Sequence, residues 1–182
     1  MKVTPLAIPD VLLIEPKIYE DSRGYFYESY NARSFDEAVG RHVQFVQDNH
    51  SLSARGVVRG LHYQLAPAAQ AKLVRVLAGE VFDVTVDIRR SSPSFGRWVG
   101  VTLSAANRRQ LWIPEGFAHG FMALSDGTEV LYKTSDFYHR AAEQSIRWDD
   151  PDLGIAWPQG FTPVVSDKDA VAPAFRSAAT FD

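Results

Sequence analysis

The sequence predicts one all-β domain, folded as a sandwich or barrel of short strands with only short peripheral helices. Runs rich in β-branched and aromatic residues recur along the chain, and turn-forming residues separate them. Helical signal is confined to a turn or two. With 182 residues, of which 46% are apolar, the chain is long enough to bury a full core without disulfides or metal.

The clearest strand signal lies in the segment 72–90, behind a turn at Gly79-Glu80. Four apolar residues alternate there with three polar ones, namely Phe82, Val84, Val86 and Ile88 with Asp83, Thr85 and Asp87. This period of two predicts a half-buried strand. Similar runs predict further strands, separated by turn signals such as Asp126-Gly127, at about 25–30, 43–48, 57–63, 97–103, 109–113, 118–124 and 129–136.

The helical signal begins at Ser34. This residue is expected to cap a short helix that ends at Val39, because Glu37 stands three residues on and completes a capping box. The C-terminal third has little periodicity, and prolines interrupt it repeatedly. We therefore expect an irregular segment from about residue 149 that wraps over the sheet, and no second domain.

Composition excludes several classes of protein and partner. The chain has no cysteine, which rules out disulfides, a thiolate nucleophile and cysteine-based metal centres and fits a reducing cytoplasm. The first 16 residues contain a single lysine and one four-residue apolar run, so neither a signal peptide nor a membrane span is expected. A net charge of -3 argues against nucleic acid as a partner, although a local arginine cluster can still bind an anionic ligand.

Two histidines stand in glycine-rich strand contexts. His62 lies in GVVRGLHYQ (56–64), and His119 lies in IPEGFAHGF (113–121). Glycines allow backbone and ligand to approach closely. Either histidine taken alone fits a structural role as well as a chemical one, so the surrounding pattern has to decide between them.

The second of these segments has the Pro-x-Gly-x-x-His form of a cupin motif. In metal-binding cupins this histidine joins a His-x-His pair and a glutamate. Here Tyr63 and Gln64 follow His62, so the three-histidine set is incomplete. The sequence therefore resembles a cupin-type jelly roll whose mouth carries histidines without a metal site.

A more specific signal comes from a series of stretches between Asp21 and Asp169. In chain order they are DSRGYFYESY (21–30), QDNHS (47–51), GVVRGLHYQ (56–64), KLVRV (72–76), FDVTVDIRRSSPSFG (82–96), LWIPEGFAHGF (111–121), WDDPDLGIAWP (148–158) and SDKD (166–169). Together they resemble the dTDP-4-dehydrorhamnose 3,5-epimerase family. The resemblance implies a homodimer without metal or other cofactor that inverts carbons 3 and 5 of dTDP-4-dehydro-6-deoxy-D-glucose.

The resemblance also implies catalytic roles. His62 would be the base and Asp169 its orienting partner, while Tyr132 would donate a proton on the opposite face of the sugar. Lys72, together with His119, would donate toward the carbonyl oxygen. The chemistry agrees, because a C–H beside a ketone is weakly acidic and needs both a positioned base and a donor for the enolate oxygen.

Substrate binding needs cations for the diphosphate and an aromatic platform for the thymine. By resemblance the phosphate and nucleotide contacts are Arg23, Arg59 and Lys168, the stacking ring is Tyr138, and the further ligand positions are Glu28, Gln47, Asn49 and Glu143. Arg59 and His62 should face opposite sides of one strand, unless a bulge or bend at Gly60 turns the chain.

Three other readings remain open. A family relative could invert only one carbon or act on another nucleotide sugar, since the same base and lysine would serve either reaction. A non-catalytic cupin-fold sugar-binding module would need neither the His62–Asp169 pair nor Tyr132. A metal-dependent cupin oxygenase or isomerase is disfavoured by Tyr63 and Gln64.

Overall fold

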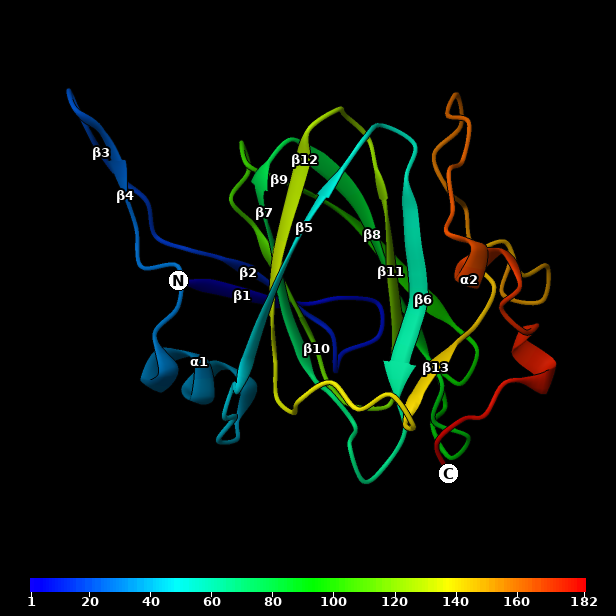
Figure 1. Ribbon diagram of the computed structural model, residues 1–182. Helices are drawn as coiled ribbons and strands as arrows, with labels where there is room; N and C mark the ends of the chain where they lie inside the picture. The colour runs from blue at the N-terminus through cyan, green and yellow to red at the C-terminus, as the bar shows by residue number, and fades with distance from the viewer.

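The computed structural model describes residues 1–182 and consists mainly of antiparallel strands in two facing sheets (Figure 1). The larger sheet holds, in spatial order, β1 (Lys2–Pro5), β2 (Leu12–Glu15), β10 (Gln110–Ile113), β7 (Lys72–Ala78), β12 (Thr128–Thr134) and β5 (Gln47–Ser53). The smaller sheet holds β13 (Glu143–Ser145), β6 (Val58–Gln64), β11 (Phe117–Ala123), β8 (Glu80–Asp87) and β9 (Trp98–Ser104). The predicted all-β jelly-roll sandwich is confirmed.

Most of the expected strands are present within a few residues of their predicted bounds, but the one expected at 43–48 is not. The ladder begins only at Gln47, where β5 starts. Val43 is buried beneath a helix beside Phe35, and Phe45 packs against the same cluster. The alternation at 43–48 therefore reflects packing under a helix rather than strand pairing.

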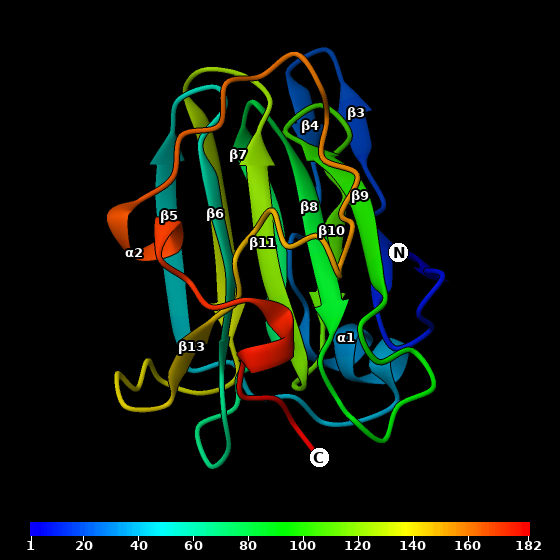
Figure 2. The ribbon, with the colours of Figure 1, turned by 90° about the vertical axis from the view of Figure 1, so that its right-hand side faces the viewer.

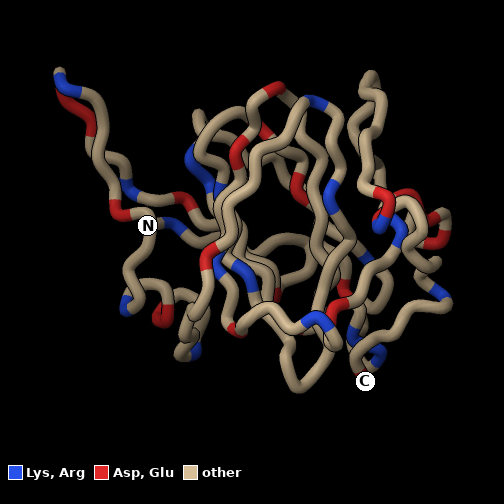
Figure 3. The backbone as a smooth tube through the Cα atoms, viewed as in Figure 1, with Lys and Arg blue, Asp and Glu red and all other residues tan.

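A hairpin of β3 (Tyr19–Asp21) and β4 (Gly24–Phe26) projects from the body of the protein (Figure 1). It replaces the longer strand expected at 25–30. Tyr25 and Phe26 are 57% and 67% exposed, and Figure 3 shows acidic and basic residues together at the tip. An isolated two-stranded hairpin is marginally stable in water, so these exposed rings mark a surface suited to contact with another molecule.

The expected helix forms as α1 (Ala32–Val39), but Ser34 does not cap it. The cap is Asn31, whose side chain accepts a hydrogen bond from the Ser34 backbone N–H at 3.3 Å. Asparagine is as good a cap as serine, and it stands where the chain enters the helix. Phe35 on the buried face of α1 packs against Trp112 on the outer side of the larger sheet.

The C-terminal segment crosses the outer face of the smaller sheet (Figure 2). Apart from α2 (Asp167–Ala170) and the 3-10 turn η1 (Phe175–Ser177), it contains no helix or extended strand. Its Leu153 and Trp157 pack with Val84 and Val86 of β8 in one buried cluster. Neither α-helix has the length and apolarity that a membrane crossing requires.

This covering makes β8 buried on both faces, so the expectation of a half-buried strand is wrong. Asp83, Thr85 and Asp87 are fully buried and face away from the C-terminal segment, toward the space between the sheets. A buried carboxylate is costly unless it is hydrogen-bonded. The partners of Asp83 and Asp87 therefore matter for both folding and chemistry.

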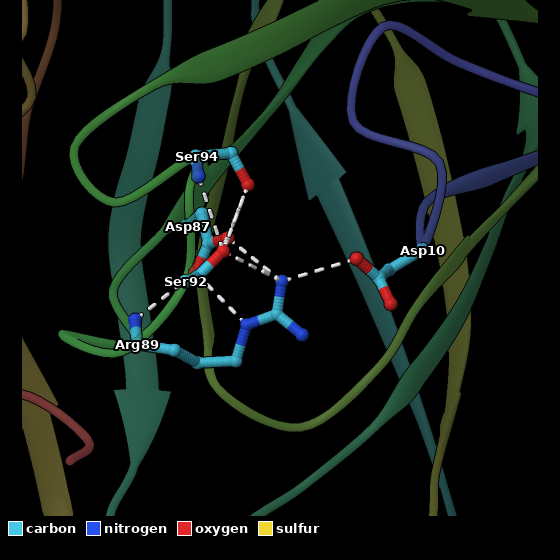
Figure 4. Close-up of polar contacts among 5 residues, drawn as sticks. All are labelled: Asp10, Asp87, Arg89, Ser92 and Ser94. Carbon is cyan, nitrogen blue, oxygen red and sulfur yellow. Dashed lines mark hydrogen bonds and ion pairs between the residues drawn. The ribbon is translucent and has the colours of Figure 1, made fainter.

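Asp87 belongs to a polar network at one end of the sandwich (Figure 4). It accepts hydrogen bonds from Arg89 Nη2 at 2.7 Å and from the hydroxyls of Ser92 and Ser94 at 2.6 Å each, and Arg89 also reaches Asp10 at 3.1 Å. Burial alone would raise the Asp87 pKa, but these bonds lower it to about 2. The network ties the β8–β9 loop to the N-terminal segment.

Candidate active site

A cavity of about 710 Å³ opens between the two sheets. Strands from both sheets and the α2 segment line it. Its walls bring together eleven of the thirteen residues that the sequence singled out, namely Gln47, Asn49, Arg59, His62, Lys72, His119, Tyr132, Tyr138, Glu143, Lys168 and Asp169. Arg23 and Glu28 lie elsewhere.

A β-bulge in β6 places Arg59 and His62 on the same wall. His62 pairs with His119 and Arg59 with Phe121, so three steps along β6 match two steps along β11. Gly60 sits in the bulge with a φ of +129°, and a Cβ there would lie 2.5 Å from the Gly120 Cα. Only glycine fits both the conformation and the space. Gly60 therefore permits the bulge, without which Arg59 and His62 would point to opposite faces of the strand.

His62 and Asp169 form a hydrogen-bonded dyad across 107 residues of sequence. His62 Nε2 lies 2.6 Å from Asp169 Oδ1, and Asp169 is only 4% exposed. The Gly60 N–H points to the other carboxylate oxygen at 3.5 Å. Burial is the largest influence and raises the Asp169 pKa, but the hydrogen bond and charge of His62, together with hydrogen bonds to Gly60 and Ser166, hold the pKa below its ordinary value. The ionised carboxylate keeps the proton on Nε2 and leaves Nδ1 free as a base.

His119 forms a second dyad with Asp83, which sequence reasoning missed. His119 Nε2 lies 2.9 and 3.0 Å from the two Asp83 carboxylate oxygens. Burial lowers the His119 pKa despite the attraction of Asp83. If the ring is neutral and donates from Nε2, its Nδ1 is unprotonated and can only accept, and the donor role expected for His119 stays a prediction.

Lys72 is a buried ammonium between the two sheets. Its Nζ donates to the main-chain carbonyl of His62 at 3.2 Å and lies 5.9 Å from the centre of the Tyr132 ring. Burial is the largest influence on its pKa and lowers it to about 8, although Asp83 and Glu143 oppose the shift. Lys72 is therefore the cation best placed to meet negative charge that develops inside the cavity.

Tyr132 faces His62 from the opposite sheet. It stands on β12 in the larger sheet, whereas His62 stands on β6 in the smaller one (Figure 1). Burial raises the Tyr132 pKa, so the phenol keeps its proton at neutral pH. A ligand between the sheets would have a base on one side and a proton donor on the other.

The mouth of the cavity carries a second group of polar side chains. The Tyr138 hydroxyl donates to Glu143 Oε2 at 3.0 Å, and Lys168 pairs with Glu143 Oε1 at 2.5 Å. Arg59 is held by the Ser53 hydroxyl and the Leu52 carbonyl, each at 3.1 Å. Two cations and an exposed aromatic ring thus surround the entrance.

Arg23 and Glu28 do not reach this cavity within one chain. Arg23 is paired with Asp21 at the exposed tip of the hairpin. Glu28 lines a separate, smaller cavity and accepts a hydrogen bond from Asn31. Their assignment as substrate contacts remains a prediction that requires a second chain.

An imidazole–carboxylate base, a buried ammonium and a phenol converging on one cavity of a jelly roll define an acid–base enzyme. The sequence model of the family described as dTDP-4-dehydrorhamnose 3,5-epimerase matches residues 5–177. The chain belongs to this family of carbohydrate epimerases.

Individual relatives agree over almost the full length. The dTDP-4-dehydrorhamnose 3,5-epimerase of Shigella flexneri is 60% identical over 181 residues, which is 100% of this chain and 99% of the relative. A Legionella pneumophila epimerase crystallised with dTDP-4-keto-L-rhamnose superposes with a TM-score of 0.93 at 53% identity, covering 97% of this chain and 93% of that one. A 3'-monoepimerase from Streptomyces bikiniensis in complex with dTDP-quinovose has a TM-score of 0.90 at 38% identity, covering 94% and 87%.

Proposed function

We propose that this protein inverts carbons 3 and 5 of dTDP-4-dehydro-6-deoxy-D-glucose and so forms dTDP-4-dehydro-L-rhamnose, a step in dTDP-L-rhamnose biosynthesis. The observation that carries the proposal is the placement of His62 and Tyr132 on opposite sheets of one cavity. Inversion requires that a proton leave one face of a carbon and that another arrive on the opposite face. The high identity to epimerases of this type supports the same reaction.

Proton removal falls to His62. Its Nδ1 takes the proton from the carbon beside the ketone, and the C–H electron pair moves to form an enolate. Asp169 stabilises the resulting imidazolium through its short bond to Nε2. A general base of this kind contributes about 10²–10⁴-fold to the rate.

The enolate oxygen needs a positive partner, and Lys72 supplies it. A buried ammonium meets developing charge in a low-dielectric site, where one well-placed donor contributes about 2.7–4 kcal/mol. His119, with its Nε2 committed to Asp83, is left to accept a hydrogen bond from a sugar hydroxyl. The two groups thus hold different oxygens of the same ring.

Tyr132 completes the inversion. Its phenol gives a proton to the enolate carbon from the face opposite His62, and solvent then reprotonates the phenolate while His62 releases its own proton. The same pair can serve carbon 3 and carbon 5 because both flank the 4-keto group. Arg59 and Lys168 would bind the diphosphate, and Tyr138 would stack on the thymine.

We propose that the reaction needs neither metal nor other cofactor. Each site histidine has its Nε2 bound to a carboxylate, and no three His, Asp or Glu side chains converge as a metal site would require.

Nucleoside diphosphate sugars are cytoplasmic metabolites, and we propose that compartment for the enzyme.

We also propose that the protein works as a homodimer in which the projecting hairpin brings Arg23 and Glu28 to the partner's cavity. The exposed rings of Tyr25 and Phe26 would then be covered. To test this, the Arg23→Ala and His62→Asn variants are mixed and reannealed. Half of the dimers would then contain one chain of each variant, and each such dimer would hold one intact site. About a quarter of the wild-type activity should therefore return. A monomer in sedimentation, or no recovery on mixing, would contradict it.

The direct test is incubation of the purified protein with dTDP-4-dehydro-6-deoxy-D-glucose, with the configuration at carbons 3 and 5 read by NMR. His62→Asn serves as the matched inactive control. Inversion at both carbons is expected. Inversion at one carbon would instead support the single-epimerase reading, which the similarity to the Streptomyces bikiniensis 3'-monoepimerase keeps open, and no change at either carbon would refute the proposal.

A further inference from the structure

The segment between β12 and β13 carries Tyr138 at the mouth of the cavity. Tyr138 and its neighbour Phe137 are 54% and 62% exposed, so little apolar packing fixes this segment. Exposed loops of this kind are normally mobile. The position of the Tyr138 ring must therefore depend on hydrogen bonds to the loop backbone.

Gln64 supplies two of these hydrogen bonds, and a third from the same side chain goes to Ala68 in the loop between β6 and β7. It is the last residue of β6, two positions after His62, and only 3% exposed. Its Nε2 donates to the carbonyls of Ala68 at 2.7 Å and Phe137 at 3.1 Å, while its Oε1 accepts from the His139 N–H at 2.7 Å. Both amide hydrogens and the carbonyl are used. A flipped amide would oppose two carbonyls with its oxygen and an N–H with its NH₂, so only this orientation works.

Two more glutamines hold the same loop. Gln70 Nε2 donates to the Asp136 carbonyl at 2.8 Å, and Gln47 Oε1 accepts from the Tyr138 N–H at 3.0 Å. One main-chain group of each residue from 136 to 139 is thus bound by a glutamine side chain. The far end of the Tyr138 ring is fixed separately by the bond from its hydroxyl to Glu143.

We infer that Gln64, helped by Gln70, is a positioning residue that presets the Tyr138 ring as a platform for the nucleobase. The inference rests on the proposed function for the stacking role of Tyr138. A ring that is already ordered costs less entropy to use on binding, so preorganisation raises affinity. Gln64 also occupies the position where a second metal-binding histidine would stand in a His-x-His motif, and its side chain serves the loop instead.

The inference predicts a selective defect in nucleotide binding. Gln64→Met keeps the size of the side chain and removes all three hydrogen bonds. We expect it to weaken dTDP binding, measured by titration calorimetry, by about tenfold, which corresponds to about 1.4 kcal/mol. KM should rise by a similar factor while kcat stays within about threefold, because the dyads are untouched. Gln70→Ala, which removes a single loop bond, should give a smaller change in the same direction and serves if Gln64→Met does not fold.

Thr128→Val is the matched control. Thr128 is also fully buried, and its hydroxyl donates to the carbonyl of Ser125 at 2.8 Å, but it lies outside the cavity. It should lower thermal stability without changing dTDP affinity. A purely structural role for Gln64 would give the same outcome as this control.

A double-mutant cycle with Tyr138→Ala separates the remaining possibilities. If Gln64 acts through the ring, Gln64→Met should have little further effect on dTDP affinity once the ring is gone. An equal loss in both backgrounds, or unchanged affinity in the Gln64→Met and Gln70→Ala variants while wild type binds dTDP, overturns the inference alone. Failure of the wild-type protein to bind dTDP would overturn the proposed function as well.

Discussion

Asp169→Asn should disable the enzyme while leaving its substrate affinity nearly intact. The aspartate accepts hydrogen bonds from His62 Nε2 at 2.6 Å and, more weakly, from the Gly60 N–H at 3.5 Å. An asparagine has only one acceptor oxygen. If that oxygen faces Gly60, the new NH₂ faces His62 and drives the ring proton onto Nδ1, the nitrogen that must act as base.

The size of the effect follows from the bond that is lost. A hydrogen bond to a charged partner contributes about 1.5–3 kcal/mol, or about 10–100-fold in rate at about 1.4 kcal/mol per decade. The wrong tautomer adds to this loss. We therefore expect kcat to fall by at least about 10²-fold and KM to change by less than about threefold. Removing His62 sets the upper bound on the loss.

The assay compares kcat and KM of wild type, Asp169→Asn, His62→Asn and the double variant. Asp149→Asn is the matched control, because Asp149 lies on the same C-terminal segment in an exposed ion pair with Arg147. The double variant should be little worse than His62→Asn alone, since the carboxylate acts through the imidazole. A rise in KM with unchanged kcat, or additive losses in the double variant, would refute the dyad.

Three further predictions concern single residues. Tyr132→Phe should lose net inversion more than proton exchange with solvent, because His62 can still remove a proton and return it to the same face; equal losses in the NMR assay would mean that the phenol takes part in deprotonation. Burial lowers the Lys72 pKa to about 8, and its cation is the active form, so kcat/KM should fall as pH rises through about 8. In Lys72→Arg this fall should occur at higher pH. A fall at the same pH in both proteins would mean that another group is titrating. Asp87→Asn should cost about 3–5 kcal/mol in urea unfolding without changing KM, and wild type should lose the Asp87 contribution as pH falls from the ordinary 3.8 toward about 2; a loss under about 1 kcal/mol would make the network dispensable.

The fold was predictable wherever strand periodicity reflects sheet pairing. The runs at 57–63 and 118–124 form β6 and β11 almost as expected. The alternation in β8 predicts where the strand lies, but it does not predict that the strand is buried on both faces. Its polar residues face the interior rather than solvent. Local periodicity cannot tell which side of a sheet another segment will cover. That covering comes from the irregular C-terminal segment.

Motifs and family resemblance predict most of the site residues, but they do not predict the residues that hold those side chains in place. Resemblance to known epimerases placed His62 and Asp169 together, and the structure finds them in contact. In the sequence Asp83 looks like one polar residue of an amphipathic strand, and Gln64 shows only that the metal-binding motif is incomplete. Asp83 lies on β8, which pairs with the strand that carries His119. This neighbourhood can be recognised only once the sheet register is known.

The most direct test of the account is deuterium incorporation from solvent into the product, followed at carbons 3 and 5 by NMR. Wild-type protein turned over in deuterated water should place deuterium at both carbons, since each new C–H bond receives its proton from a group that exchanges with solvent. His62→Asn should place deuterium at neither carbon. Inverted product without deuterium at carbons 3 and 5, or exchange that persists in His62→Asn, would contradict proton abstraction by His62.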